Sequence, residues 1–295
     1  MSKLRVLIPV LFAVACSSDS DADAQAAASA KTTCRVNTES TVMARSIAET
    51  SGLVIGQQGI LWTHNDSGND PVLYGLDRSL NLVASVNLTG TTFDDWEDLT
   101  TGSCATGHCL FAADIGDNEG RRANITIHEL EEPAAGITSA RIKQSRTFRY
   151  PDRSQDAEAI FQTANGDFYI VTKGRQGPIA LYRLPAGRTE PNAVLERVRE
   201  LFPRPASNED RVTAASISPD GAWVALRTYR DLRFYPAAAL LSGQPVRPIV
   251  AQVDELKMRT GESIAWGKDN VIWLTSEAGS RTRQPTIGSV TCDLK

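Results

Sequence analysis

Short apolar runs, rich in Val, Ile, Leu, Trp and Tyr, recur roughly every ten residues along the chain. Gly, Asn, Asp and Pro separate these runs. Few stretches show the three-to-four-residue apolar spacing of a helix. Apolar runs bounded by turn residues are typical of β-strands. The pattern therefore predicts an all-β fold.

A longer repeat groups the expected strands into five units. The units open on "ETSGLV", "DWEDLT", "DAEAIF", "TAASIS" and "TGESIAW". The equivalent position in the five units is occupied by Ser51, Glu97, Glu158, Ala215 and Glu262. Successive members of this set are 46, 61, 57 and 47 residues apart. Two more strands follow in each unit, and the first four units have a fourth. Repeated four-stranded antiparallel sheets form a β-propeller, so we predict five four-stranded blades.

The last unit ends after three strands, at "TIGSVTC". The segment "CRVNTEST", residues 34–41, precedes the first unit and has no partner there. We therefore expect this N-terminal strand to complete the last blade and close the ring. Six blades are an alternative because two units are long. A β-sandwich with accidental periodicity is another.

The five cysteines fit this closure. If one is lipidated, four remain, and four allow three connectivities. Ring closure would bring Cys34 beside the strand that carries Cys292, and Cys104 and Cys109 flank the turn "ATGH". We predict the disulfides Cys34–Cys292 and Cys104–Cys109. A zinc site made by Cys104, His108 and Cys109 is the alternative, although it lacks a fourth ligand nearby.

Residues 1–15 have the pattern of a signal peptide. Lys3 and Arg5 precede an apolar run that is too short to span a bilayer. Small residues then precede Cys16, as in a bacterial lipobox, where the cysteine becomes the lipidated first residue. We therefore expect an exported protein anchored in the cell envelope at Cys16. The alternative is a secretory signal cut near residue 24 or 30, which would give a freely secreted or periplasmic protein.

Residues 16–31 are small, polar and aperiodic, which predicts a flexible tether. Residues 32–295 form the expected single propeller domain, which we predict to be monomeric. Loss of residues 1–15 leaves 29 basic and 35 acidic residues, a net charge of 29 − 35 = −6. This balance argues against nucleic acid as a partner, and against membrane contact except through the lipid anchor.

Polar residues gather at two places in the repeat. In a propeller, the loops that enter the first strands and leave the second strands open on one face, the mouth of the central channel. The expected first strands begin with Glu49, Asp95, Glu97, Asp156, Glu158 and Glu262. The expected second strands end with His64, Asn65, Asp66, Asp114, Asp117, Asn118, Lys173, Arg175, Arg227 and Glu277.

Crowded carboxylates raise one another's pKa unless positive charge lies among them. The segments "DWED", "DIGDN" and "DAEA" are rich in the oxygen ligands that Ca²⁺ prefers. Alternatively, Lys173 and Arg227 neutralise the acids in a buried ion network. The two interpretations are compatible.

A cation together with Lys173 and Arg227 would suit an anionic ligand such as a phosphate ester. The catalytic candidates are His64, Glu97 and Glu158. His64 is either a general base or a hydrogen-bonded turn residue. The further candidate ligand contacts are Asn65, Asp66, Glu262 and Glu277.

The remaining aromatic and histidine residues receive simpler interpretations. Trp96 either stacks on a ligand or wedges between first strands, and we favour the wedge. Three tryptophans and a tyrosine of the second strands are expected in the core: Trp62, Tyr169, Trp223 and Trp273. His108 and His128 fall outside the repeat register, and we expect them at the surface.

The segments "LWTHNDSG", "DWEDL", "ADIGDN", "DAEAI", "YIVTK" and "SISPDG" resemble uncharacterised secreted bacterial propellers. These proteins are loosely similar to the phytase-like, esterase-like propeller group, and the resemblance covers residues 49–235. It implies a propeller fold and an extracytoplasmic location.

Likeness to the calcium-dependent propeller phytases implies phosphate contacts from Lys173 and Arg227. It implies Ca²⁺ ligands at Asp95, Glu97, Asp114, Asp117, Asp156 and Glu158. Ala215 and the five expected blades depart from that family, whose members have six blades.

The leading functional hypothesis is an exported, lipid-anchored propeller that binds a small anionic ligand at the mouth, with or without Ca²⁺ as cofactor. A metal-dependent phosphoester hydrolase is the competing class. A cell-envelope interaction module without catalysis is the third.

Overall fold

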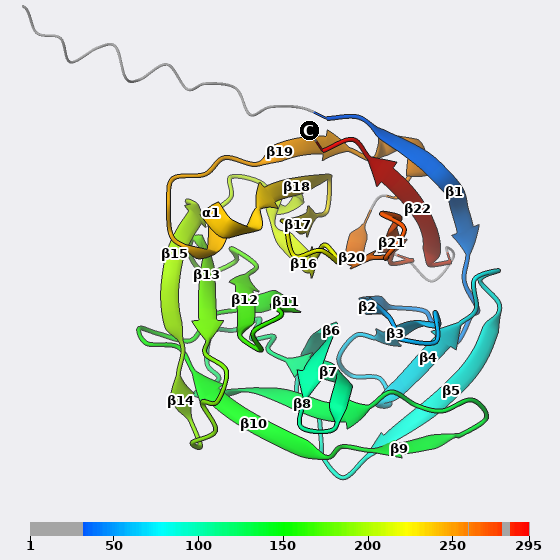
Figure 1. Ribbon diagram of the computed structural model, residues 1–295, viewed down its shortest axis with the longest axis horizontal. Coiled ribbons are helices and arrows are strands. Elements are labelled where there is room, and N and C mark those ends of the chain that lie inside the picture. Colours follow the sequence, from blue (N-terminus) through cyan, green and yellow to red (C-terminus); the bar gives the residue numbers. More distant parts are fainter. Residues whose placement is uncertain (1–31, 259, 279–283, 295) are drawn as a thin grey trace, which may run out of the picture.

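Five mainly antiparallel sheets surround a central axis in the computed structural model, which describes residues 32–258, 260–278 and 284–294 (Figure 1). The predicted five-bladed propeller is therefore confirmed. The first strand of each blade lies innermost in the ring (Figure 1). These inner strands are β2 (Thr50–Ile55), β6 (Trp96–Cys104), β11 (Ala157–Gln162), β16 (Val212–Ile217) and β20 (Gly261–Trp266).

Three further strands follow outward in each blade. Blade 1 continues with β3 (Leu61–Asn65), β4 (Val72–Leu76) and β5 (Leu82–Thr89), and blade 2 with β7 (Gly107–Asp114), β8 (Ile125–Glu131) and β10 (Gln144–Arg149). Blade 3 continues with β12 (Phe168–Thr172), β13 (Ile179–Leu184) and β15 (Glu196–Phe202), and blade 4 with β17 (Trp223–Thr228), β18 (Asp231–Pro236) and β19 (Ile249–Gln252). Blade 5 continues with β21 (Ile272–Ser276), β22 (Thr286–Cys292) and β1 (Cys34–Val42).

Two short strands extend the outer edges of the first two blades, and the sequence did not predict them. The strand β9 (Ser139–Arg141) pairs in parallel with β5, and β14 (Ala193–Val194) pairs in parallel with β10. Each lies in a connection of the following blade, so it links neighbouring blades at the rim. The helical segments are η1 (Asn208–Asp210), α1 (Ala237–Leu241) and η2 (Asp254–Leu256). No helix of the described residues is long and apolar enough to cross a membrane.

The N-terminal strand closes the ring, as predicted. The strand β1 pairs antiparallel with β22, and Cys34 stands directly opposite Cys292. The two cysteines form a disulfide across 258 residues of sequence.

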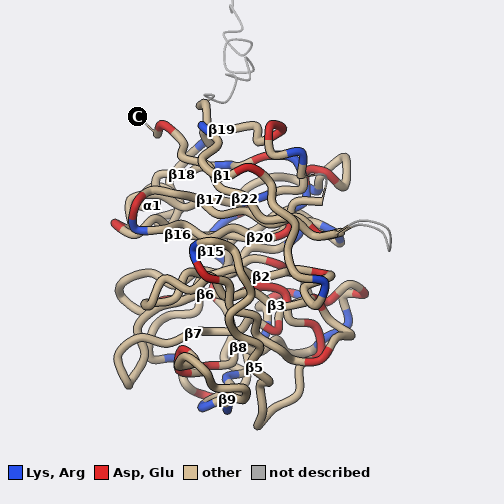
Figure 2. Tube along the Cα trace, turned by 90° about the vertical axis from the view of Figure 1, so that its right-hand side faces the viewer, with Lys and Arg blue, Asp and Glu red and all other residues tan. Residues whose placement is uncertain are grey.

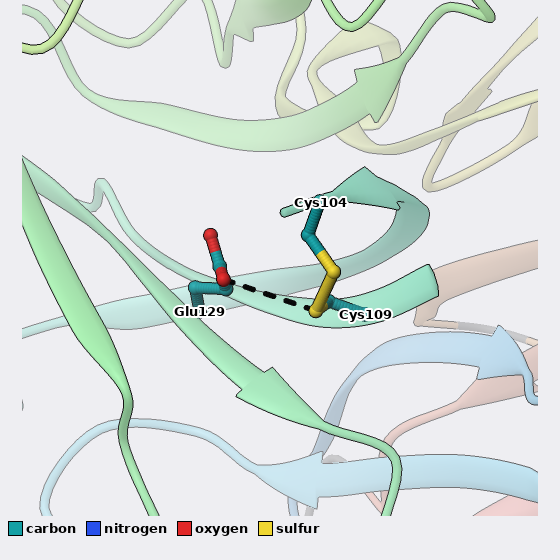
Figure 3. Close-up of side chains that lie close together, drawn as sticks. All are labelled: Cys104, Cys109 and Glu129. Atoms are coloured by element: carbon teal, nitrogen blue, oxygen red, sulfur yellow. Dashed lines mark hydrogen bonds between the residues drawn. A yellow bond between two sulfur atoms is a disulfide. The ribbon is translucent and has the colours of Figure 1, made fainter. Parts of the chain in front are cut away.

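The second predicted disulfide, Cys104–Cys109, closes the turn between β6 and β7 (Figure 3). The zinc alternative is therefore wrong, because disulfide sulfurs are not thiolate ligands. A carboxylate oxygen of Glu129 lies 3.8 Å from Sγ of Cys109, but that sulfur has no proton to donate. Disulfides are typical of an oxidising, extracytoplasmic environment.

The core lies between neighbouring blades. Trp62 and Tyr169 are buried there in separate hydrophobic clusters, and the half-buried Trp223 and Trp273 pack against two further clusters, as expected. The expectation that His128 lies at the surface is wrong: it is 2% exposed. Its Nδ1 lies 2.8 Å from the Ser145 hydroxyl, a partner on β10 that sequence spacing does not reveal. Around the outside, acidic and basic positions are interspersed (Figure 2).

The two disulfides should contribute unequally to stability. The chain-entropy model assigns about 5–6 kcal/mol to the longer cross-link and about 2 kcal/mol to the shorter, for sequence separations of 258 and 5. Two double variants test this, Cys34→Ser/Cys292→Ser and Cys104→Ser/Cys109→Ser. Guanidinium unfolding measures how much unfolding free energy each variant loses. Equal losses would contradict a ring held closed by the first bond.

Candidate functional site

Every inner strand carries a register irregularity at its mouth end, where it pairs with the end of the second strand. A β-bulge leaves a residue unpaired and re-aims its side chain. The residues left out of the pairing are Ser51, Glu97, Glu158, Thr213 and Glu262. Gly52, next to Ser51, and Ser263, next to Glu262, are also unpaired. Three glutamates from three blades are thus displaced from the ladder at one mouth.

The repeat position of the fourth blade is therefore Thr213, and the alignment to Ala215 is wrong by two residues. Ala215 pairs regularly with Leu226 and is buried. The hydroxyl of Thr213 donates to the Gly261 carbonyl at 2.9 Å. The Ser51 hydroxyl does the same to the Glu97 carbonyl at 2.6 Å. Hydroxyl residues thus tie neighbouring blades where glutamates are absent.

Asp98, which sequence reasoning did not single out, is fully buried beneath the mouth. Its carboxylate accepts amide hydrogens from Leu99 at 2.8 Å and Ile160 at 3.0 Å, and also from Ala215. Burial raises the pKa of Asp98 well above its usual range, although the three amides act in the opposite direction. This side chain joins the inner strands of blades 2, 3 and 4.

Lys173 lies among the glutamates and is 5% exposed. Its ammonium forms an ion pair with Glu158, and its charge also acts on Glu97 and Glu262. The Lys173 side of the predicted ion network is therefore present. Tyr229, which the sequence analysis missed, places its ring 5.9 Å from the ammonium. It follows β17 directly, but an aromatic residue in a turn gives no sequence signal of a site.

Arg227 is the second expected cation, and it is 1% exposed. Burial lowers its pKa to about 10, and Glu262 acts in the opposite direction. Among the described residues, no carboxylate lies within ion-pair distance of Arg227. Its Nη2 lies 3.6 Å from the Met258 sulfur, and the guanidinium packs closely on Gly261. Arg227 therefore balances the mouth only at longer range.

Two acidic clusters are able to hold a metal ion. In each, carboxylate oxygens lie within 4.8 Å of one another: Asp66, Asp95 and Glu97 in the first, and Glu97, Asp156 and Glu158 in the second. Burial, together with repulsion from Asp95, raises the pKa of Asp66 to about 6. Burial, and then the Asp66 charge, raises the pKa of Glu97 well above its usual range.

The loop after β7 forms a cradle for the first cluster. The Gly116 amide donates to the Asp95 carbonyl at 2.9 Å. A Cβ on Gly116 would lie 2.3 Å from Oε1 of Glu97 and 2.5 Å from Oδ2 of Asp95. Only glycine lets both carboxylates approach the backbone this closely.

Asp114 and Asp117 lie outside both clusters. Asp114 accepts the amides of Asp94 and Asp95, each at 2.9 Å, and pairs with Arg122 at 2.8 Å. The two Asp117 oxygens accept the amides of residues 121 and 122, each at 2.8 Å. These acids shape the loops on which the clusters stand.

His64 has both ring nitrogens engaged. Its Nε2 accepts the Gly52 amide at 3.0 Å, and its Nδ1 donates to the Asn65 carbonyl at 2.8 Å. Burial lowers the pKa of His64 to about 4, so the ring is neutral at physiological pH. Trp96 is 1% exposed and its ring centre lies 3.8 Å from that of His64 on β3, so it is packed in the protein and does not present its ring to a ligand.

Asn65 also holds the backbone around β2. Its side-chain oxygen accepts the Glu49 amide at 3.2 Å, and its amide nitrogen donates to the Ser46 carbonyl at 2.8 Å. In blade 5, the side chains of Glu262 and Glu277 are hydrogen-bonded to each other. Burial raises the pKa of both, so this pair holds a proton more readily than isolated glutamates.

No protein-family model matches the chain, and no curated protein sequence matches it. Among solved structures, the PQQ-bound aldose sugar dehydrogenase of Streptomyces coelicolor has a TM-score of 0.54 and 9% identity, over 90% of this chain and 99% of that one. A gluconolactonase of Xanthomonas campestris has a TM-score of 0.45 and 11% identity, over 91% and 99% of the two chains. Virginiamycin B lyase of Staphylococcus aureus has a TM-score of 0.43 and 10% identity, over 86% of this chain and 74% of that one. The first similarity supports the propeller fold, and at such identities none transfers an activity.

In the metal-free protein, replacing Asp66 with asparagine should stabilise the fold more at pH 7 than at pH 5. The pKa of Asp66 is raised from 3.8 to about 6, so its stabilising contribution is present at low pH and is lost as the pH rises through 6. The gain in unfolding free energy should grow by on the order of 1 kcal/mol between the two pH values. Guanidinium unfolding at both values measures it. Asp70→Asn, an exposed acid of the same loop, is the control, and an equal change there would contradict the assignment.

Proposed function

We propose that this chain is an exported propeller, held in the cell envelope through Cys16, that binds a divalent cation at the channel mouth and a small ligand through that cation. The observation that supports this proposal is the cluster of Asp66, Asp95 and Glu97, which lacks an ion-pair partner in the described part of the chain. None of the three lies within 4 Å of a basic side chain in the described part of the chain. No ion pair within the described chain therefore balances the charge that these three acids carry when ionised.

The donor chemistry fits a hard cation. All three side chains offer carboxylate oxygens, which Ca²⁺ prefers, and the Gly116 cradle keeps two of them close. The second cluster is different, because Lys173 pairs with Glu158 and Arg175 pairs with Asp156 at 2.9 Å. Asp66, Asp95 and Glu97 are thus the proposed Ca²⁺ ligands. Bound Ca²⁺ would supply positive charge and open coordination positions to a ligand oxygen.

An anionic ligand remains the proposed class, with phosphate esters as its first examples. The mouth holds more carboxylates than basic groups, so an anion gains attraction there only once a cation is bound. Lys173 and Arg227 are both buried, and they would strengthen such binding mainly through their charge.

Export is supported by the two disulfides, which are typical of oxidising compartments. The signal peptide, the lipid anchor at Cys16 and the tether over 16–31 lie outside the described residues and remain predictions. Labelling with palmitate tests the anchor, and an unlabelled Cys16 protein would exclude it.

Phosphoester hydrolysis is the second candidate, carried by the resemblance to the phytase-like group. A hydrolase needs a group that accepts a proton from water. His64 has no free nitrogen for this task, and Glu158 is paired with Lys173. Glu97 is the remaining candidate, so the geometry favours binding over turnover. An interaction module would use neither the cation nor Glu97.

Calcium should raise the melting temperature of the wild-type protein, and EDTA should reverse the effect. Saturation at about 100 times the dissociation constant adds about 2.7 kcal/mol to the unfolding free energy. Gly116→Ala should abolish this shift, because the added methyl group would occupy the cradle between Asp95 and Glu97. Gly177→Ala is the control, since its Cβ would meet mainly the mobile end of Arg153. No shift in the wild type would exclude the cation site.

If calcium binds, p-nitrophenyl phosphate separates the two functions. A binder should show no calcium-dependent release of nitrophenol above the buffer rate. A hydrolase should show release that Glu97→Gln removes, because that carboxylate would hold the cation or accept a proton from water. Turnover that survives in Glu97→Gln would contradict the assigned role of Glu97.

A further inference from the structure

The two acidic clusters have the layout of a two-ion centre. Glu97 belongs to both clusters, as a bridging carboxylate belongs to both ions of a dinuclear site. Asp66 and Asp95 complete one side, and Asp156 and Glu158 complete the other. Dinuclear hydrolases hold their ions about 3.5–4 Å apart and use both of them on one substrate.

One side of this centre already contains two basic side chains, because Lys173 pairs with Glu158 and Arg175 pairs with Asp156 at 2.9 Å. The Lys173 side chain is 7% exposed and its ammonium contacts Glu158, and its charge acts on Glu97. The Lys173 backbone is fixed on both sides, because its amide donates to the Asp156 carbonyl at 2.9 Å and its carbonyl accepts the Val212 amide at 3.2 Å. The ammonium is therefore a built-in part of the cluster.

We infer that the Glu97–Asp156–Glu158 cluster is a second cation position that the Lys173 ammonium fills, so that the mouth binds one divalent ion rather than two. The single ion rests on the proposed function. The filling of the second position rests on the Lys173–Glu158 contact.

The inference narrows the chemistry of the mouth. A ligand oxygen between the two positions would meet a divalent ion on one side and a fixed monovalent ammonium on the other. This arrangement can hold one anionic group, but it lacks the paired metal ions that stabilise both the attacking and the leaving oxygen in two-metal hydrolysis.

Calcium stoichiometry tests the inference. Isothermal titration of the full mature chain with calcium chloride should give one site in the wild type and two in Lys173→Met. Lys143→Met is the matched control, because Lys143 pairs with Glu131 on the outer part of blade 2, and it should keep one site. The double variant Lys173→Met/Glu158→Gln removes both charges of the buried pair and should return to one site. Circular dichroism confirms that each variant folds. If Lys173→Met does not fold, Lys173→Gln replaces it. Lys173→Gln should also give two sites.

The outcomes separate this inference from the proposed function. Two sites in the wild type, or one site in both the wild type and the folded Lys173 variant, would overturn the inference and leave the proposed function standing. No site in the wild type but one in the Lys173 variant would overturn the proposed function and support the inference. No site in either protein would overturn both.

Discussion

The buried carboxylate of Asp98 links three blades through amides of Leu99, Ile160 and Ala215. Sheets of a propeller meet mainly through side chains, so polar links at the axis fix how the blades are set against one another. The hydroxyls of Ser51 and Thr213 supply similar links from blade 1 to blade 2 and from blade 4 to blade 5. Inner strands consequently approach closely: a Cβ on Gly52 would lie 2.5 Å from the Leu99 nitrogen. The acids of the mouth therefore lie on closely packed, cross-linked inner strands.

At the mouth end of these strands, the bulges concentrate charge. A regular strand would place alternate side chains in the interfaces between blades, whereas a displaced residue escapes the ladder. Glu97, Glu158 and Glu262 meet there because the same irregularity recurs in three blades. Burial makes their ionisation costly, and Lys173 compensates part of that cost. The excess of carboxylates over basic groups at this face is the basis of the proposed cation site.

Much of the fold was predictable because it depends on repetition. Alternating apolar strands, an unpaired N-terminal strand and cysteines at both ends predict five blades and their closure. The displaced register of blade 4 was not predictable, because "TAASIS" has the same pattern whether Thr213 or Ala215 leaves the ladder. Burial of His128 and the role of Asp98 depend on partners in other strands, which a single sequence does not identify. The mouth acids were predicted as a set, but their division into two clusters depends on three-dimensional distances.

The direction of the closing strand determines how the molecule is presented to its surroundings. The strand β22 begins beside Ser276, at the mouth, and ends at Cys292, so Cys34 lies on the opposite face. The N-terminal end of the described chain therefore leaves the ring on the side remote from the acids. Any attachment through the N-terminus would therefore join the propeller at the side opposite the mouth. Ligands could then approach the open mouth without steric interference from the surface to which the protein is attached.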